Sequence, residues 1–133
     1  MTIVVGYVPS ADGAAALAAA AEEAALRTQR LVVVNSGARG DFSLDMFADG
    51  HDLDAVAADL TRRGIEHEIR QPTSGNSPAN ELLAVAEEVS ATMIVIGMRR
   101  RSAVGKLILG STAQTVMLGA GCSVLAVKTA PPA

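Results

Sequence analysis

The feature that most constrains the fold of this chain is a regular alternation of apolar runs with amphipathic segments. Five runs are predicted to be strands, at 2–8, 31–36, 65–71, 92–98 and 123–128. Most are continuously apolar, which is typical of strands buried on both faces of a parallel sheet. The run at 65–71 alternates apolar with charged residues instead, so we expect it at a sheet edge with one face exposed to solvent.

Four segments between these runs show the spacing of amphipathic helices, at about 11–28, 51–63, 77–89 and 111–119. The first has residues at helical spacing that predict a buried stripe, namely Leu17, Ala21, Ala24 and Thr28. The second is predicted to end at Gly64. The third has the clearest start signal, because Ser77 can cap a helix and Pro78 fits the first helical position.

This order of elements predicts an α/β fold with a mostly parallel sheet, helices on both faces and right-handed crossovers. In such sheets ligands bind beyond the carboxyl ends of the strands, where the strand order reverses. The loops that follow residues 8 and 97 are therefore predicted to form the site. A length of 133 residues fits one domain, 1–133.

Charge and composition restrict the class of ligand. The formal net charge of −3 provides no general attraction for polyanions, and only three residues are aromatic, which disfavours stacking platforms for single-stranded nucleic acid. One basic patch exists, formed by Arg99, Arg100, Arg101 and Lys106. A patch this small suits the phosphate tail of a mononucleotide, so we expect no nucleic-acid partner.

The chemistry of the remaining reactive residues favours neither catalysis nor a metal site. His51 and His67 fall in different predicted elements, and the chain has no pair of His or Cys at metal-ligand spacing. Cys122 is the only cysteine and has no basic neighbour to lower its pKa, so an inert thiol is expected. With no signal-like or membrane-spanning run, we expect a cytoplasmic protein that does not bind membranes.

The segment "GMRRRSAVGKLILGST" at 97–112 contains the strongest candidate for anion binding. It is not a P-loop, because Arg100 stands where the first glycine is required and Leu107 follows Lys106 in place of a hydroxyl residue. The alternative is a helix start at Gly110, where backbone N–H groups and the hydroxyls of Ser111 and Thr112 would meet the anion. Arginine side chains from the loop would add charge.

The spacing of Gly97, position 100 and Gly110-Ser111 resembles the G-2x-G-9x-G-(S/T) signature of ATP-binding universal stress proteins. The resemblance covers the whole chain. It implies a three-layer sandwich around a five-stranded parallel sheet of order 3-2-1-4-5, a Rossmann-like fold of the adenine nucleotide alpha hydrolase type. It also implies a homodimer formed through 123–128, and a stress-response regulator that binds ATP without efficient turnover, acting through an unknown protein partner.

The resemblance also nominates the residues of the site. Carried over by position, they are Val8, Pro9, Ser36, Gly97, Gly110, Ser111 and Thr112, with the guanidinium groups of Arg99 and Arg100 beside them. Any Mg²⁺ would be held by the phosphates, since dedicated protein carboxylates are not evident.

Two positions depart from the family pattern. Arg100 replaces the second glycine of the signature, and Val8 stands where an acidic residue is usual, with Asp12 the nearest carboxylate. Arg100 either removes a backbone contact or supplies a guanidinium fork that suits phosphate oxygens. Two alternative functions therefore stay open: a dimeric interaction module that binds no nucleotide, and a slow nucleotide hydrolase.

Overall fold

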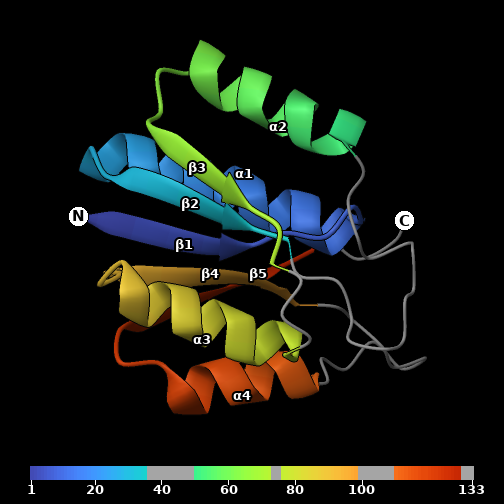
Figure 1. The fold of residues 1–133 in the computed structure, drawn as a ribbon, viewed down its shortest axis with the longest axis vertical. Coiled ribbons are helices and arrows are strands. Elements are labelled where there is room, and N and C mark those ends of the chain that lie inside the picture. Colours follow the sequence, from blue (N-terminus) through green and yellow to red (C-terminus); the bar gives the residue numbers. More distant parts are fainter. Residues whose placement is uncertain (36–49, 73–75, 99–109, 130–133) are drawn as a thin grey trace.

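The computed structural model describes residues 1–35, 50–72, 76–98 and 110–129 (Figure 1). The strands are β1 (Thr2–Gly6), β2 (Arg30–Val34), β3 (His67–Arg70), β4 (Met93–Met98) and β5 (Ser123–Lys128). The helices are α1 (Ala11–Arg27), α2 (Gly50–Arg62), α3 (Pro78–Glu88) and α4 (Ser111–Gly119). Within these described ranges, no helix combines the length and the apolar character needed to cross a membrane.

The five strands form one parallel sheet in the order β3-β2-β1-β4-β5, which confirms the predicted topology. The central strand β1 pairs on both sides, with Val4 opposite Val32 of β2 and opposite Ile94 of β4. β3 lies at one edge, as its alternating sequence predicted. Strand order reverses between β1 and β4, and ligands of such sheets usually bind beyond the strand ends at this point.

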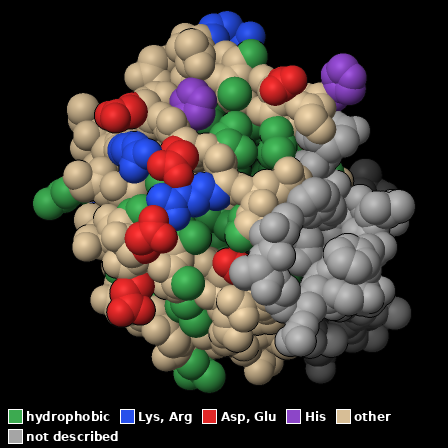
Figure 2. Space-filling view, viewed as in Figure 1, with side chains coloured by type: hydrophobic (Ala, Val, Ile, Leu, Met, Phe, Trp, Pro, Cys, Tyr) green, Lys and Arg blue, Asp and Glu red, His purple; other side chains and the backbone are tan. Residues whose placement is uncertain are grey.

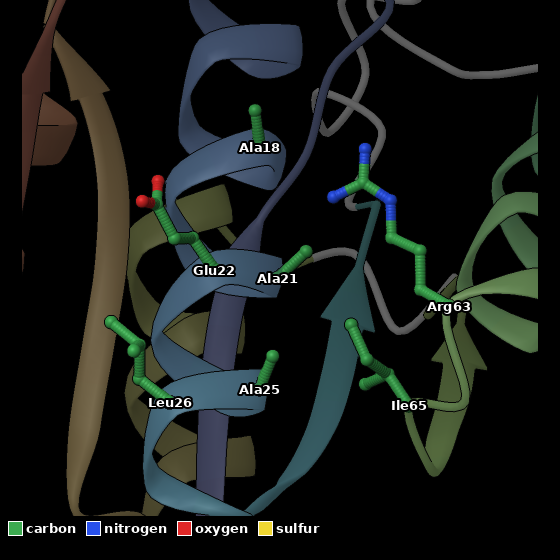
Figure 3. A pocket seen from close by; sticks show the side chains of 7 residues that line it. All are labelled: Ala18, Ala21, Glu22, Ala25, Leu26, Arg63 and Ile65. Carbon is green, nitrogen blue, oxygen red and sulfur yellow. The ribbon is translucent and has the colours of Figure 1, made fainter.

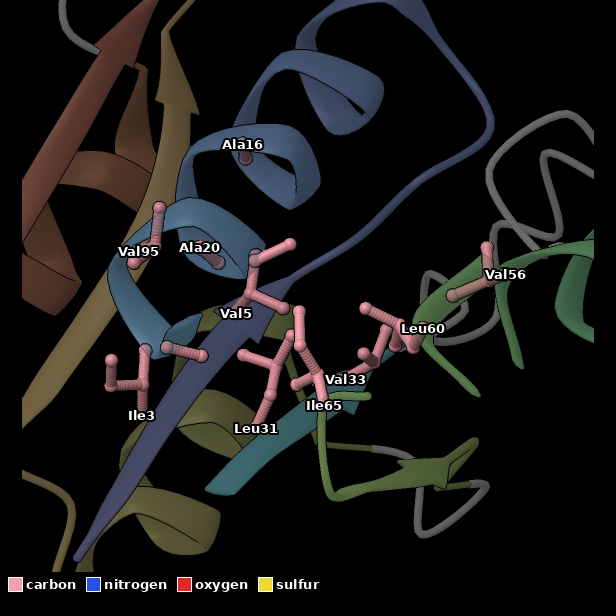
Figure 4. Packing of buried hydrophobic residues seen from close by; sticks show 12 residues of the cluster. Ile3, Val5, Ala16, Ala20, Leu31, Val33, Val56, Leu60, Ile65 and Val95 are labelled. Carbon is pink, nitrogen blue, oxygen red and sulfur yellow. The ribbon is translucent and has the colours of Figure 1, made fainter. Parts of the chain in front are cut away.

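Helices cover both faces of the sheet because its central strands are apolar on both sides. Successive residues of a strand point to opposite faces. Ile3, Val5 and Leu31 therefore pack under α1 and α2 (Figure 4), while Val4 and Val32 pack against α3 and α4. These strand residues are completely buried, and burial of each such side chain contributes about 1.5–3 kcal/mol. The result is the expected three-layer sandwich.

Local signals in the sequence determine where several helices begin and end. The Ser10 hydroxyl accepts a hydrogen bond from the Gly13 N–H (3.3 Å) at the start of α1. Ser77 caps α3 in the same way through the Asn80 N–H (3.2 Å), and Pro78 occupies its first turn as predicted. After α2, Gly64 has a φ of +72°, a conformation that costs glycine little.

Several predicted boundaries differ from the structure by one or two residues, and two of these differences have a clear cause. β1 ends at Gly6 rather than at residue 8, because the Ser10 N–H turns back to the Val8 carbonyl (2.8 Å) and Pro9 has no N–H to offer a ladder. Thr28 was predicted in the buried stripe of the first helix, but it is exposed and caps α1 with a φ of 53°. The buried stripe consists of smaller residues, which let α1 approach the sheet closely: Gly13, Ala16, Ala20, Ala21 and Ala24.

An ion-pair cluster lies beside the β3 edge. Glu68 accepts hydrogen bonds from Arg70 and from Arg30 (2.5 Å), and Arg70 also pairs with Glu88 of α3 (2.6 Å). Acidic and basic side chains are correspondingly interleaved over this region in Figure 2. The bonds from Arg70 first and Arg30 second hold the pKa of Glu68 below its ordinary value. Charged residues on an edge strand also discourage pairing with another chain.

Replacing Glu68 by glutamine is expected to lower the free energy of unfolding at neutral pH by less than about 1 kcal/mol, because partly exposed ion pairs contribute little. A lowered pKa in the folded state means that the carboxylate stabilises the fold above its ordinary pKa of 4.5. That contribution is lost as the pH falls through the folded-state value. Urea denaturation at neutral and acid pH should therefore show a difference that disappears in acid, with Glu66→Gln as an exposed control.

Candidate functional site at the carboxyl edge of the sheet

The carboxyl ends of the strands and the first turns of α1, α3 and α4 lie along one edge of the molecule (Figure 1). Val8 and Pro9 follow β1, Gly97 lies near the end of β4, and Gly110 precedes α4. Topology brings these predicted residues to the edge at which the strand order reverses. Residues 88 to 102 positions apart in sequence therefore lie at one candidate site.

The N-terminus of α4 has features that favour an anion. Gly110 is its N-cap residue, with φ −69° and ψ 163°, and as a glycine it has no side chain that could cap the first N–H groups. No described atom lies within 4 Å of the position that a Cβ on Gly110 would occupy. Ser111 and Thr112, which follow, are exposed. The first N–H groups of a helix lack intrahelical acceptors and carry partial positive charge, so they favour a phosphate.

The turn between β1 and α1 forms the other end of the site. Val8 and Pro9 are half-buried, and the Ser10 cap directs the chain into α1 directly behind them. The turn packs tightly, since a Cβ on Gly13 would come within 1.8 Å of the Val8 carbonyl oxygen. Asp12 lies in the first turn of α1, and the cap is Ser10.

Gly97 is required by packing as well as by its place in the signature. A Cβ at this position would lie 2.5 Å from the carbonyl oxygen of Asp12, closer than real Cβ atoms approach other atoms. The first turn of α1 can therefore rest on the end of β4 only if residue 97 has no side chain. The glycine brings the β1–α1 turn and the end of β4 together, and these two pieces form one wall of the site.

A buried amide at the same edge was not predicted from the sequence. Asn35 follows β2 and is completely buried. Its Nδ2 donates to the Tyr7 carbonyl (2.8 Å), and its Oδ1 accepts from Gln71 Nε2 (2.9 Å). The signal in the sequence was an amide residue placed directly after a strand that is entirely apolar.

Three predicted site residues, Ser36, Arg99 and Arg100, lie outside the described residues. Their roles therefore stay predictions. Ser36 directly follows Asn35, and Arg99 directly follows β4, so both adjoin segments that the structure places at the carboxyl edge.

The histidines lie away from this edge or at its margin. His51 is exposed in the first turn of α2, and His67 is half-buried in β3 with its Nδ1 2.9 Å from the Ile65 carbonyl oxygen. In the part of the chain that the structure describes, no three His, Cys, Asp or Glu side chains are grouped so that they could hold a metal ion.

Tyr7 lies under the site. Desolvation raises the pKa of its phenol, and the nearby Asp52 carboxylate of α2 raises it further. The ring packs against the core on the α1 side of the sheet. A neutral phenol at physiological pH leaves this part of the edge without a negative charge from Tyr7.

Cys122 is expected to react slowly with thiol reagents. It is half-buried between α4 and β5, and burial raises the pKa of its thiol, so less thiolate is present at neutral pH. Alkylation by iodoacetamide, followed by mass spectrometry, should be slower in the folded protein than in urea. Equal rates would contradict the placement of this side chain.

A hollow lies toward the opposite end of the sheet, and its lining differs from the residues of the candidate site. A shallow depression of about 660 Å³ lies between α1 and the connection from α2 to β3, and Figure 3 shows the side chains that line it. Its lining is mostly small and apolar, with two charged residues: Ala18, Ala21, Glu22, Ala25, Leu26, Arg63 and Ile65. Ile65 precedes β3, and Leu26 lies in the last turn of α1, which places the hollow toward the amino ends of the strands. It offers no helix N-terminus to an anion.

Comparison with known proteins gives consistent matches over nearly the whole chain. The model of the universal stress protein family matches residues 1–128. A universal stress protein of Mycolicibacterium smegmatis is 43% identical over 127 residues, which cover 95% of this chain and 96% of that relative.

Solved structures agree with this assignment. A universal stress protein from Archaeoglobus fulgidus superposes with a TM-score of 0.80 at 36% identity, covering 96% of this chain and 98% of that one. The structure of the universal stress protein from the same organism in complex with dAMP gives a TM-score of 0.75 at 31% identity, with the same coverage.

Proposed function

Because the chain belongs to the universal stress protein family, we propose that it binds an adenine nucleotide, ATP, at the carboxyl edge between β1 and β4. The observation that carries this proposal is the start of α4, which lies beside the point where strand order reverses and where no described atom lies within 4 Å of a Cβ added at Gly110. A helix N-terminus in this position is suited to phosphate groups. The similar Archaeoglobus fulgidus protein in complex with dAMP supports an adenine nucleotide as the ligand.

Each end of the site has a distinct role in the proposal. The N–H groups at 110–112 and the hydroxyls of Ser111 and Thr112 bind the phosphates, with Arg99 and Arg100 adding positive charge. Val8, Pro9 and Ser36 flank the base, and Gly97 lets the first turn of α1 rest on the end of β4. Mg²⁺, when present, is held by the phosphate oxygens rather than by protein carboxylates.

The proposed output is regulation in a stress response, in the cytoplasm, without efficient turnover of the nucleotide. Hydrolysis needs a positioned general base within hydrogen-bond reach of the attacking water. Among the described residues that we assign to the site, the side chains are aliphatic or hydroxyl groups, and no histidine or cysteine belongs to the set. The nucleotide would then act by changing the conformation that a protein partner recognises.

We further propose a homodimer formed through β5. This strand pairs with β4 on one side only, so it is a sheet edge. Its central residues are apolar and only half-buried: Val124, Leu125, Ala126 and Val127. The opposite edge carries the Glu68 ion-pair cluster instead, so β5 is the edge better suited to pairing with a second chain.

Isothermal titration with ATP tests the binding proposal. Binding by the wild-type protein is expected. Absence of both heat and a thermal shift at millimolar ATP would contradict the proposal that the protein binds ATP. The variant Arg100→Gly distinguishes the two roles of that residue. A loss of affinity identifies it as a phosphate ligand, while a large gain shows that it blocks the site and favours an interaction module that binds no nucleotide.

Turnover has its own assay. Phosphate release that is measurable and is reduced in Ser111→Ala would replace the regulator by a slow nucleotide hydrolase. Release at the background rate in both proteins agrees with the proposal.

A further inference from the structure

The side chain of Asn35 continues the sheet by one row beyond its last backbone pairs. Gly6, Val34 and Arg70 are the last paired residues of β1, β2 and β3. Tyr7, Asn35 and Gln71 form the next row, in which the Tyr7 N–H donates to the Val34 carbonyl (2.9 Å) and the Asn35 N–H to the Arg70 carbonyl (2.9 Å). Hydrogen bonds of the Asn35 side-chain amide to Tyr7 and Gln71 then join the ends of all three strands.

The orientation of this amide follows from its partners. A backbone carbonyl can only accept, so the NH₂ group of Asn35 must face Tyr7 and its carbonyl oxygen must face Gln71. The side chain is completely buried, so a polar group of this amide that loses its partner cannot be hydrated instead. These partners therefore fix the orientation of the Asn35 amide.

The consequence for the site lies one residue further along the chain. The carbonyl that Asn35 holds belongs to Tyr7, directly before Val8 and Pro9, which the proposed function places against the base. On the other side of that turn, Gly13 lets α1 pack onto Val8. The turn is thus held at both ends, by a buried hydrogen bond and by close packing. A turn fixed in this way loses less conformational entropy when a ligand binds.

We propose that Asn35 is a positioning residue for the base end of the nucleotide site, an inference that rests on the proposed function. It does not contact the phosphates, which belong to α4 at the other end. Its removal should therefore weaken binding of the base and sugar while leaving the attraction for phosphate unchanged. A general loss of stability would weaken both.

The test compares two probes, ATP and inorganic tripolyphosphate, on the full chain by isothermal titration. Asn35→Ala is expected to lower the affinity for ATP about tenfold, equivalent to one well-placed hydrogen bond, and to leave the affinity for tripolyphosphate unchanged. Gln71→Met keeps the bond from Asn35 to Tyr7 and removes the hydrogen bond that the Asn35 Oδ1 accepts from Gln71. A smaller loss for ATP is expected, again without change for tripolyphosphate.

Gln29→Ala is the matched control. Its amide also joins segments of the sheet, since Gln29 Oε1 accepts from Thr92 Oγ1 (2.6 Å), but this bond lies at the amino edge. A similar loss of stability with unchanged ATP affinity is expected.

The outcomes separate the two proposals. If the wild-type protein binds ATP and Asn35→Ala binds it equally well, or loses ATP and tripolyphosphate affinity in equal measure, the positioning role is wrong and the nucleotide site stands. If the wild-type protein binds no nucleotide, both proposals fall. Should Asn35→Ala fail to fold, Gln71→Met decides, because unchanged ATP affinity in that variant also overturns the role.

Discussion

Replacement of Gly13 by alanine is expected to lower the free energy of unfolding by about 1–3 kcal/mol, the usual cost of overpacking. The sign is opposite to the general rule, because exchanging glycine for alanine inside a helix normally gains about 0.5–1 kcal/mol. At this position the added methyl group would lie 1.8 Å from the Val8 carbonyl oxygen and 2.6 Å from its nitrogen. Backbone cannot rotate away as a side chain can, so α1 or the turn must move.

Urea denaturation followed by circular dichroism measures this change. Gly50→Ala is the matched control, since Gly50 is also helical and no described atom lies within 4 Å of the added group. The control should be neutral or slightly stabilising. A Gly13→Ala variant as stable as the wild type would show that α1 does not rest on the β1–α1 turn as described.

Replacement of Ser111 by glutamate is expected to change helix stability and nucleotide binding in opposite directions. Ser111 is exposed in the first turn of α4, where a carboxylate interacts favourably with the helix dipole by about 0.3–1 kcal/mol. The same negative charge would stand among the N–H groups that are assigned to the phosphates. Repulsion between like charges a few ångströms apart should lower ATP affinity by at least about tenfold.

Thr115→Glu provides the control for charge alone. Thr115 is also exposed in α4 but lies one turn beyond its N-terminus. It adds the same charge away from the first N–H groups, so a much smaller loss of affinity is expected. Thermal unfolding without nucleotide and titration with ATP give the two readouts. Equal losses in both variants would show that the start of α4 is not where the phosphates bind.

Much of the fold was predictable because it depends on short-range patterns. Continuous apolar runs identify buried parallel strands, and the alternating run at 65–71 correctly identified β3 as an edge. The start of α3 followed from Ser77 and Pro78 alone. The end of β1 was not predicted, because apolar residues continue to Val8 while the hydrogen bonds do not. The error at Thr28 arose because helical spacing alone does not show where a helix ends.

The place of the candidate site was predictable for a similar reason. The topology of a parallel sheet brings the ends of β1 and β4 and the start of α4 to one edge, whatever the side chains are. The roles of Asn35 and Gly13 were not predictable, because each depends on a three-dimensional contact, of Asn35 with Tyr7 and of Gly13 with the folded-back Val8. Such contacts have no local pattern in the sequence.

Gly97 belongs to the sequence signature and is also required by the packing of the fold. In the sequence it is the first glycine of a nucleotide-binding signature, and in the structure it is also the point at which α1 touches β4. The requirement for glycine here is therefore evidence for the fold independently of any ligand. The support for a nucleotide comes instead from the start of α4, where no described atom would contact a side chain at position 110.

A titration of the ¹⁵N-labelled protein with ATP, followed by amide NMR shifts, tests the central claim most directly. Binding at the carboxyl edge predicts the largest shifts at Val8, Gly97, Ser111 and Thr112, with the amide of Ala18 unaffected. No shifts at millimolar ATP, or shifts confined to the hollow around Ala18 and Arg63, would contradict the proposed site.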